Sequence, residues 1–422
     1  MLCVLGSPAI LGCSAGTRVH AAFDALDVGA SWRAPHRGTD ARLQLRFAGC
    51  PPVDPLARQI ASLSPVPEMS LDNPCDLDIL RGTTGLRELS ITLARPLAID
   101  PLRRTPELRE LHIHVTDEPA IVDVSPLAGH PALALLDLQI RGDRGGGFVG
   151  VEQLHLPALQ NLFLREVRGF QRIDWLAASP ELAVLDLMRT DVTDLDPLAA
   201  TTALMLVDIR ETGVVDVAAL ARSPNLTTLN ARGARIRDLE PLRGSALHDL
   251  GIGKTAVHDL RPLATMTGLQ RLDLLALKIR DLGPLARLTR ISHLNLAGTG
   301  VTDCSVLAGL PALNNVDLRD TPISSLECLR GAHKLRDLAL GPGIVSLEPL
   351  RDNPNLARIF LTARTADTLE VLRTLPALEN VLLDHGSFTD EEIQSLRRNR
   401  RNLRVEGHCH ARLDSLPACE DR

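Results

Sequence analysis

The chain has 422 residues, 45% of them hydrophobic and only 2% aromatic, with a formal net charge of −6 at neutral pH. This negative charge argues against nucleic acid or an anionic membrane surface as the general partner. A membrane-spanning helix needs about 18 consecutive apolar residues, and no run in this sequence is that long. We therefore expect no membrane insertion.

Cysteine usage bears on the cellular compartment. The eight cysteines are scattered and form no CxxC pair, which is unlike a disulfide-dense scaffold. We therefore expect a cytoplasmic location. Residues 1–16 contain a short apolar run ending in Leu11-Gly12-Cys13, similar to a lipoprotein cleavage site, but the basic segment that should precede it is missing. Export is the less favoured alternative.

Residues 1–39 form an N-terminal segment with little repetition. Within residues 17–28, Val19, Phe23 and Leu26 recur at helical spacing. The ends of a stacked array expose a hydrophobic core that needs covering, so we expect a short capping helix here.

Residues 40–385 repeat one phrase with a period of 22 residues, in about 16 units. Clear copies are LAVLDLMRTDVTDLDPLA, which begins at Leu182, and LQRLDLLALKIRDLGPLA, which begins at Leu269. A fixed period of this length indicates a stacked repeat protein, in which each unit buries its apolar face against its neighbours.

Positions in a unit are numbered from its first leucine. Apolar positions 4 and 6 flank polar position 5, which predicts a short strand with one face inward. The phrase at residues 194–199 predicts a capped single turn, mainly 3-10, because Asp194 can accept backbone N–H bonds and Pro197 fixes φ. A threonine at position 9, such as Thr190, can bond the backbone through its hydroxyl.

The template LxxLxLxxTxVxDLxPLA resembles that of the 22-residue, internalin-like class of bacterial leucine-rich-repeat proteins, over about residues 40–405. The resemblance implies an α/β solenoid: a horseshoe with a concave parallel β-sheet and a convex side of 3-10 turns and short helices. This chain departs from the class at position 9, where the family usually has asparagine.

The units that start at residues 108, 133 and 159 are longer than the others, and their extra length includes RGDRGGGFVG at 141–150. Such a glycine-rich insertion predicts a loop at one edge of the solenoid, either merely tolerated or used in binding. Residues 386–422 predict a C-terminal helical cap and tail. Thr389 with Glu392 forms a capping box, and Leu403 and Val405 suit a last strand.

Two segments contain residues typical of a phosphate-binding loop or a zinc site, but neither has the full motif. GIGKT at 251–255 looks like the end of a phosphate-binding loop, yet His248 replaces the required first glycine and the repeat makes Ile252 an inward strand residue. His408, Cys409 and His410 lack the spacing of a zinc site. We therefore expect no cofactor, no metal and no enzymatic activity. Cys304 and Cys328 fall at inward positions and are interpreted as small core residues.

Without a catalytic motif, we expect protein recognition on the concave face. Position 5 carries a column of acids and asparagines, position 7 carries arginines that could neutralise them, and a few large apolar residues lie among them. The predicted contact residues are Met188, Leu206, Asp208, Arg210, Arg232, Asp273, Leu275, Asp317, Phe163 and Phe360.

Two other functions remain open at this stage. Similar arrays resemble the C-terminal parts of bacterial NACHT-type signalling NTPases, so the chain could be the ligand-sensing region of such a system. It could instead be an exported adhesin of the internalin type, which needs a signal peptide and a surface anchor. In each case we expect a monomer and a protein partner, and the sequence does not identify that partner.

Overall fold

The computed structural model describes residues 23–24, 26, 28–33, 41–116, 120–141, 147–384, 389–397 and 403–408. The chain divides into two compact units, one of residues 1–214 and 222–225 and the other of residues 215–221 and 226–422. None of the helices in the described ranges is long and apolar enough to cross a membrane.

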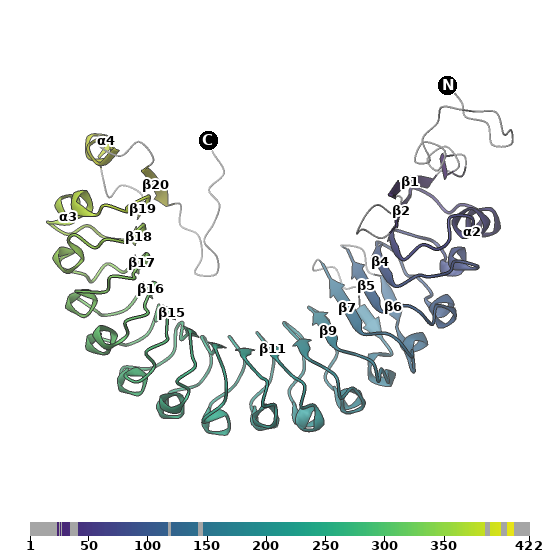
Figure 1. The fold of residues 1–422 in the computed structure, drawn as a ribbon, viewed down its shortest axis with the longest axis horizontal. Coiled ribbons are helices and arrows are strands. Elements are labelled where there is room, and N and C mark those ends of the chain that lie inside the picture. The colour runs from purple at the N-terminus through teal and green to yellow at the C-terminus, as the bar shows by residue number, and fades with distance from the viewer. Residues whose placement is uncertain are drawn as a thin grey trace. The chain divides into compact units, whose positions relative to one another are not determined.

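The first unit contains a ladder of parallel strands with one antiparallel strand, β1, at its start (Figure 1). The α-helix α2 (Val53–Ala61) follows the second strand. The strands are β1 (Val28–Arg33), β2 (Arg42–Phe47), β3 (Glu68–Asp72), β4 (Glu88–Leu93), β5 (Glu110–Val115), β6 (Ile121–Asp123), β7 (Leu135–Ile140), β8 (Gly147–Val149), β9 (Asn161–Arg165), β10 (Val184–Asp186) and β11 (Leu206–Asp208).

The second unit continues the same pattern with parallel strands alone. Its strands are β12 (Thr228–Asn230), β13 (Asp249–Gly251), β14 (Arg271–Asp273), β15 (His293–Asn295), β16 (Asn315–Leu318), β17 (Asp337–Leu340), β18 (Arg358–Leu361), β19 (Asn380–Asp384) and β20 (Arg404–His408). The α-helices are α3 (Thr368–Thr374) and α4 (Asp390–Arg397).

Short 3-10 turns return the chain from one strand to the next. They are Leu77–Leu80, Asp100–Arg104, Ser125–Leu127, Val151–Gln153, Asp174–Ala178, Asp196–Ala200, Ala218–Arg222, Glu240–Leu242, Arg261–Thr265, Gly283–Leu285, Ser305–Gly309, Glu327–Leu329 and Glu348–Leu350. The predicted solenoid of strands and 3-10 turns is confirmed.

The repeat phrase explains this local structure. Leu185 and Leu187 at positions 4 and 6 are fully buried. At the 3-10 turn, the Asp194 carboxylate accepts the backbone N–H of Asp196 at 2.8 Å, which confirms the predicted cap. The hydroxyl of Thr190 donates to the carbonyl of Leu187 at 2.8 Å, so the position-9 threonine closes the turn after its own strand.

The predicted pairing of Thr389 with Glu392 is present at the start of α4. The backbone N–H of Glu392 donates to the Thr389 hydroxyl at 3.3 Å, while the Glu392 carboxylate accepts the Thr389 N–H at 3.0 Å. These reciprocal bonds form a capping box at the start of α4. Leu403 and Val405 are buried, as expected for a last strand.

Several predictions fall on residues outside those described: most of the helix over 17–28, residues 142–146 of the insertion, and the tail with Cys409 and His410. Of the N-terminal residues that are described, Phe23 is fully buried. The insertion was predicted as a loop, but its last part, Gly147–Val149, is strand β8 and pairs with β6. GIGKT is the end of β13 followed by a turn, and the next 3-10 turn begins only at Arg261.

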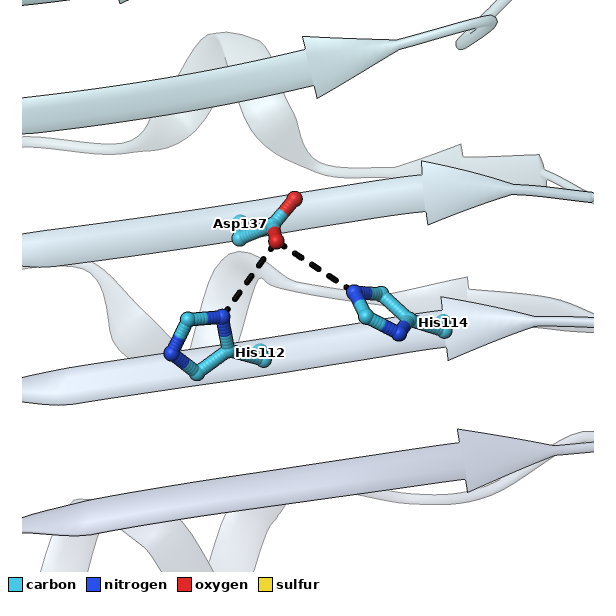
Figure 2. A group of neighbouring side chains, drawn as sticks. All are labelled: His112, His114 and Asp137. Carbon is cyan, nitrogen blue, oxygen red and sulfur yellow. Dashed lines mark hydrogen bonds and ion pairs between the residues drawn. The ribbon is translucent and has the colours of Figure 1, made fainter. Parts of the chain in front are cut away.

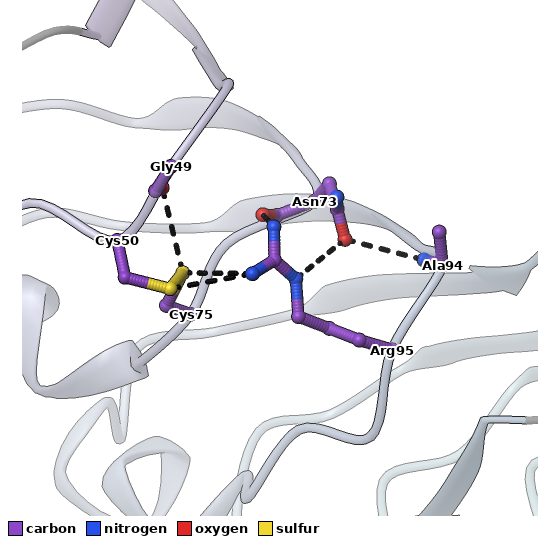
Figure 3. Close-up of a disulfide and its surroundings, with 6 residues drawn as sticks. All are labelled: Gly49, Cys50, Asn73, Cys75, Ala94 and Arg95. Carbon is purple, nitrogen blue, oxygen red and sulfur yellow. Dashed lines mark hydrogen bonds between the residues drawn. A yellow bond between two sulfur atoms is a disulfide. The ribbon is translucent and has the colours of Figure 1, made fainter.

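The interpretation of Cys304 and Cys328 as small core residues was incomplete. Both are buried, but they form a disulfide between neighbouring repeats, and Cys50 and Cys75 form a second one. The guanidinium of Arg95 lies 3.3 and 3.2 Å from the sulfurs of Cys50 and Cys75 (Figure 3). Sequence spacing alone gave no pairing, because the partners are 25 and 24 residues apart and meet only through the repeat period.

Candidate functional site

The outward face of the sheet in the second unit carries one column of side chains at position 5. Strand register aligns Asn295 with Asp317, Asp317 with Ala339, Ala339 with Phe360, and Phe360 with Leu382. The column changes from polar to apolar at Ala339. Because alanine is much smaller than its neighbours in the column, a depression forms over it.

This depression is a pocket of about 300 Å³. We call it the Ala339 pocket. Its lining combines buried aliphatic residues with polar and charged residues, and consists of Asn315, Val316, Asp317, Arg319, Asp337, Leu338, Ala339, Arg358, Ile359, Phe360, Asn380 and Leu382.

Two ion pairs hold the charged residues of the pocket. Arg319 binds the Asp317 carboxylate through two nitrogens, with Nη2 at 2.6 Å from Oδ2. The Arg319 guanidinium also lies 5.3 Å from the centre of the Phe360 ring, within the range of a cation–π contact. Arg358 pairs with Asp337 on the neighbouring strand. The pocket therefore offers an apolar interior beside fixed charges of both signs.

The acids of position 5 have a structural role that the sequence did not reveal. Four of these aspartates and one asparagine accept the backbone N–H of the residue two positions later, each at 3.0 Å: Asp186, Asp208, Asp273, Asn295 and Asp317. This bond turns the chain out of the strand, as Asx turns do. Asp186 and Asp208 are only 3% and 7% exposed, so little of their carboxylates is available to a partner.

The predicted neutralisation of this column is found in the structure. Arg210 binds Asp208 through Nε and Nη2, and Arg319 binds Asp317. Asp186 is instead neutralised by Arg165, whose Nε lies 2.6 Å from the carboxylate. Burial raises the pKa of Asp273, and the nearby positive charge of Arg232 opposes that effect.

The predicted apolar contacts differ in exposure. Phe163, Met188 and Leu206 are partly exposed on the first unit, while Phe360 is 8% exposed in the Ala339 pocket. Leu275 was predicted on the surface but is only 3% exposed. The reason is Gly253 in the preceding repeat: a Cβ there would lie 2.9 Å from Leu275 Cβ, so the absence of a side chain lets Leu275 pack against the backbone.

Asp317 and Phe360 are thus the two predicted contacts that share the Ala339 pocket. Sequence reasoning missed Ala339, Asp337 and Arg358. A signal was available: the polar column of position 5 gives way to alanine, phenylalanine and leucine in three consecutive units.

A second group missed from sequence lies in the first unit. His112 and His114 of β5 both approach Asp137 of β7, with His112 Nδ1 and His114 Nε2 each 3.3 Å from Asp137 Oδ2 (Figure 2). The hydrogen bond with Asp137 raises the pKa of His112. Burial alone would raise the pKa of Asp137, but the bonds from the two histidines hold it well below its usual range.

Comparisons with known proteins address the fold. No protein-family model and no curated protein sequence matches this chain. A solved leucine-rich-repeat protein of Leptospira interrogans matches with a TM-score of 0.63 at 15% identity, covering 86% of this chain and 99% of that one. This chain has the leucine-rich-repeat fold.

Two further structures resemble this leucine-rich-repeat chain. A chain of the Toll–Spatzle complex from Drosophila matches with a TM-score of 0.56 at 16% identity, covering 84% of this chain and 51% of that one. An internalin of Listeria monocytogenes matches with a TM-score of 0.44 at 19% identity, covering 88% of this chain and 87% of that one. The predicted likeness to bacterial leucine-rich-repeat proteins is confirmed at the level of the fold.

Proposed function

We propose that this leucine-rich-repeat protein recognises a protein partner through the outward face of its sheet, without catalysis, and that the Ala339 pocket holds an anchoring side chain of that partner. The pocket itself carries the proposal. Binding energy at protein interfaces concentrates where a large side chain enters a well-packed, desolvated site surrounded by polar groups. Phe360 and Leu382 form the apolar wall of the pocket. The ion pairs that Arg319 and Arg358 make form its polar rim.

The size of the pocket favours a side chain over a cofactor. About 300 Å³ is the lower limit for small-molecule sites, which extend to about 1,000 Å³. The flanking charges are already paired, so the pocket does not demand a strongly charged ligand. We infer that the anchor is a single large apolar residue on a partner of mixed charge. The Toll–Spatzle structure, which resembles this chain in fold, is the structure of a complex.

The test fills the pocket. Ala339→Trp places a large side chain in the depression, and the matched control Ala308→Trp adds the same side chain at an exposed position of the 3-10 turn Ser305–Gly309. Partners enriched from the native host by the unmodified protein are identified by mass spectrometry and their affinities measured with purified proteins. We expect Ala339→Trp to weaken binding at least about tenfold, equivalent to about 1.4 kcal/mol, and Ala308→Trp to leave it unchanged. Equal affinities for both folded variants would rule out the pocket as the anchor.

The two disulfides favour a second proposal, concerning location. Disulfides persist in oxidising compartments and are rare in the cytoplasm. Cys50–Cys75 and Cys304–Cys328 therefore support export, as in an internalin-type adhesin, over the cytoplasmic location and the NACHT-type sensor. Cell fractionation with mass spectrometry of unreduced peptides tests this. A chain found only in the cytosol with free thiols at these positions would reject it.

A further inference from the structure

We propose that His112, His114 and Asp137 bind a divalent transition-metal ion, with Zn²⁺ as a suitable probe. The three residues supply two imidazole nitrogens and one carboxylate oxygen within 4.8 Å of one another. Imidazole and carboxylate are common ligands for zinc and related ions in proteins. The site lies in the first unit and does not depend on the Ala339 pocket.

The repeat geometry creates this arrangement. Alternate residues of a strand point to the same side, so His112 and His114 both project from the outward face of β5. The register pairs His112 with Asp137 on β7, and the Asp137 side chain lies between the two imidazoles (Figure 2). Their positions are therefore fixed by three strand residues rather than by a loop, which favours a preformed site.

The distances match those of a metal site. Two metal–ligand bonds of about 2.0–2.1 Å at a tetrahedral angle separate their donor atoms by about 3.3–3.4 Å. Both histidine nitrogens lie 3.3 Å from Asp137 Oδ2. One donor atom of each of the three residues lies within 4.8 Å of the others, and binding an ion would bring the two imidazole nitrogens to the same spacing of about 3.3–3.4 Å.

The burial of Asp137 is a second observation beside the geometry. Its Oδ1 is buried and has no hydrogen-bond partner among the described residues, so the negative charge of the carboxylate is poorly solvated. A cation bound at Oδ2 would compensate part of the cost of burying that charge. Glu88 and Glu110 act electrostatically on His112 from the same face and add negative potential. Three protein ligands leave at least one coordination position for water or for a donor atom of a partner.

The experiment measures Zn²⁺ binding by isothermal titration calorimetry to the full chain freed of metal with a chelator. We expect one ion per chain at this site, and at least about tenfold weaker binding in Asp137→Asn and in His114→Ala. The control His293→Ala removes a histidine from the second unit and should bind as the unmodified protein does. X-ray absorption at the zinc edge should show two imidazole ligands at about 2.0–2.1 Å.

Circular dichroism establishes that each variant is folded. Zn²⁺ should raise the melting temperature of the unmodified protein, because a ligand that binds only the folded state stabilises it, and should not raise that of Asp137→Asn. Absence of stoichiometric binding would overturn the proposal. So would binding that is retained in folded Asp137→Asn but lost when His408, the last residue of β20, and His410 are both replaced by alanine.

Discussion

The role of Asp208 can be tested by comparing two substitutions, one that keeps an acceptor oxygen for the backbone bond and one that does not. Asp208 Oδ1 accepts the backbone N–H of Arg210 at 3.0 Å, and both carboxylate oxygens contact the Arg210 side chain. Asp208→Asn keeps an oxygen that can accept the backbone bond and removes the negative charge. Asp208→Ala removes both. If the residue mainly shapes the turn, alanine should be much more damaging than asparagine.

The structure indicates how much each substitution should lower the free energy of unfolding. The Arg210 side chain is 38% exposed, so the loss of its ion pair should lower the free energy of unfolding by at most about 1 kcal/mol. Asp208→Ala also leaves the partly buried N–H of Arg210 without its partner, which costs about 1–3 kcal/mol more. We therefore expect losses of about 1 kcal/mol or less for Asp208→Asn and about 2–4 kcal/mol for Asp208→Ala. Urea unfolding followed by circular dichroism measures both.

The control is Glu181→Ala, an exposed acid on the same unit, which should lie within about 0.5 kcal/mol of the unmodified protein. If Asp208→Ala and Asp208→Asn were equally stable, the backbone bond would contribute little and the structural explanation of this column would be refuted. If the explanation holds, reversing the charge of Asp208 is a poor test of binding, because the substitution would also damage the fold.

Three further changes probe stability. Leu229 is fully buried, so Leu229→Ala should lower the free energy of unfolding by about 2–5 kcal/mol in urea titration; a loss under 1 kcal/mol would contradict its place in the core. His130 is buried, and its Nε2 lies 3.0 Å from the carbonyl oxygen of Thr105. Burial lowers the pKa of His130, so as pH falls the histidine is protonated in the unfolded chain before it is protonated in the folded protein. The contribution of His130 to stability should be complete above about pH 6.5 and decline below it by up to about 1.4 kcal/mol per pH unit, so the decline should be smaller in His130→Gln than in the unmodified protein. Replacing both Cys304 and Cys328 by serine frees a segment of 24 residues and should lower stability by about 3 kcal/mol, whereas an unchanged melting temperature would show that the disulfide does not form.

The sequence predicted the parts of this fold that recur. Leu185 and Leu187 could be assigned to the core because the same positions are apolar in unit after unit, and Asp194 could be assigned as a cap because its phrase always precedes a turn. The burial of Leu275 could not be predicted this way. It depends on Gly253, a residue 22 positions earlier whose missing side chain matters only once the repeats are stacked.

The candidate sites could not be predicted from the repeat pattern for the same reason. Asp317 and Phe360 were selected as separate exposed residues, but the pocket that joins them depends on the small size of Ala339 between them. Nothing in the sequence links His112 to Asp137, because 25 residues separate them and the longer repeats of this region obscure the period. In both cases the chemistry arises between neighbouring units, where a single repeat gives no signal.

Position 5 therefore has two physical roles along the array. In most units that carry aspartate or asparagine here, the side chain bonds its own backbone and stabilises the turn, as Asp273 does with the N–H of Leu275; Asp137 instead bonds His112 and His114. Where it departs from that pattern, the backbone bond is given up and the side chain is released for other contacts. His112 and Ala339 are such departures, and each lies at a candidate binding site. Since a lost turn bond lowers stability, departures in a regular array are the positions at which we expect binding to compensate, and substitution of either residue by aspartate should impair binding more than folding.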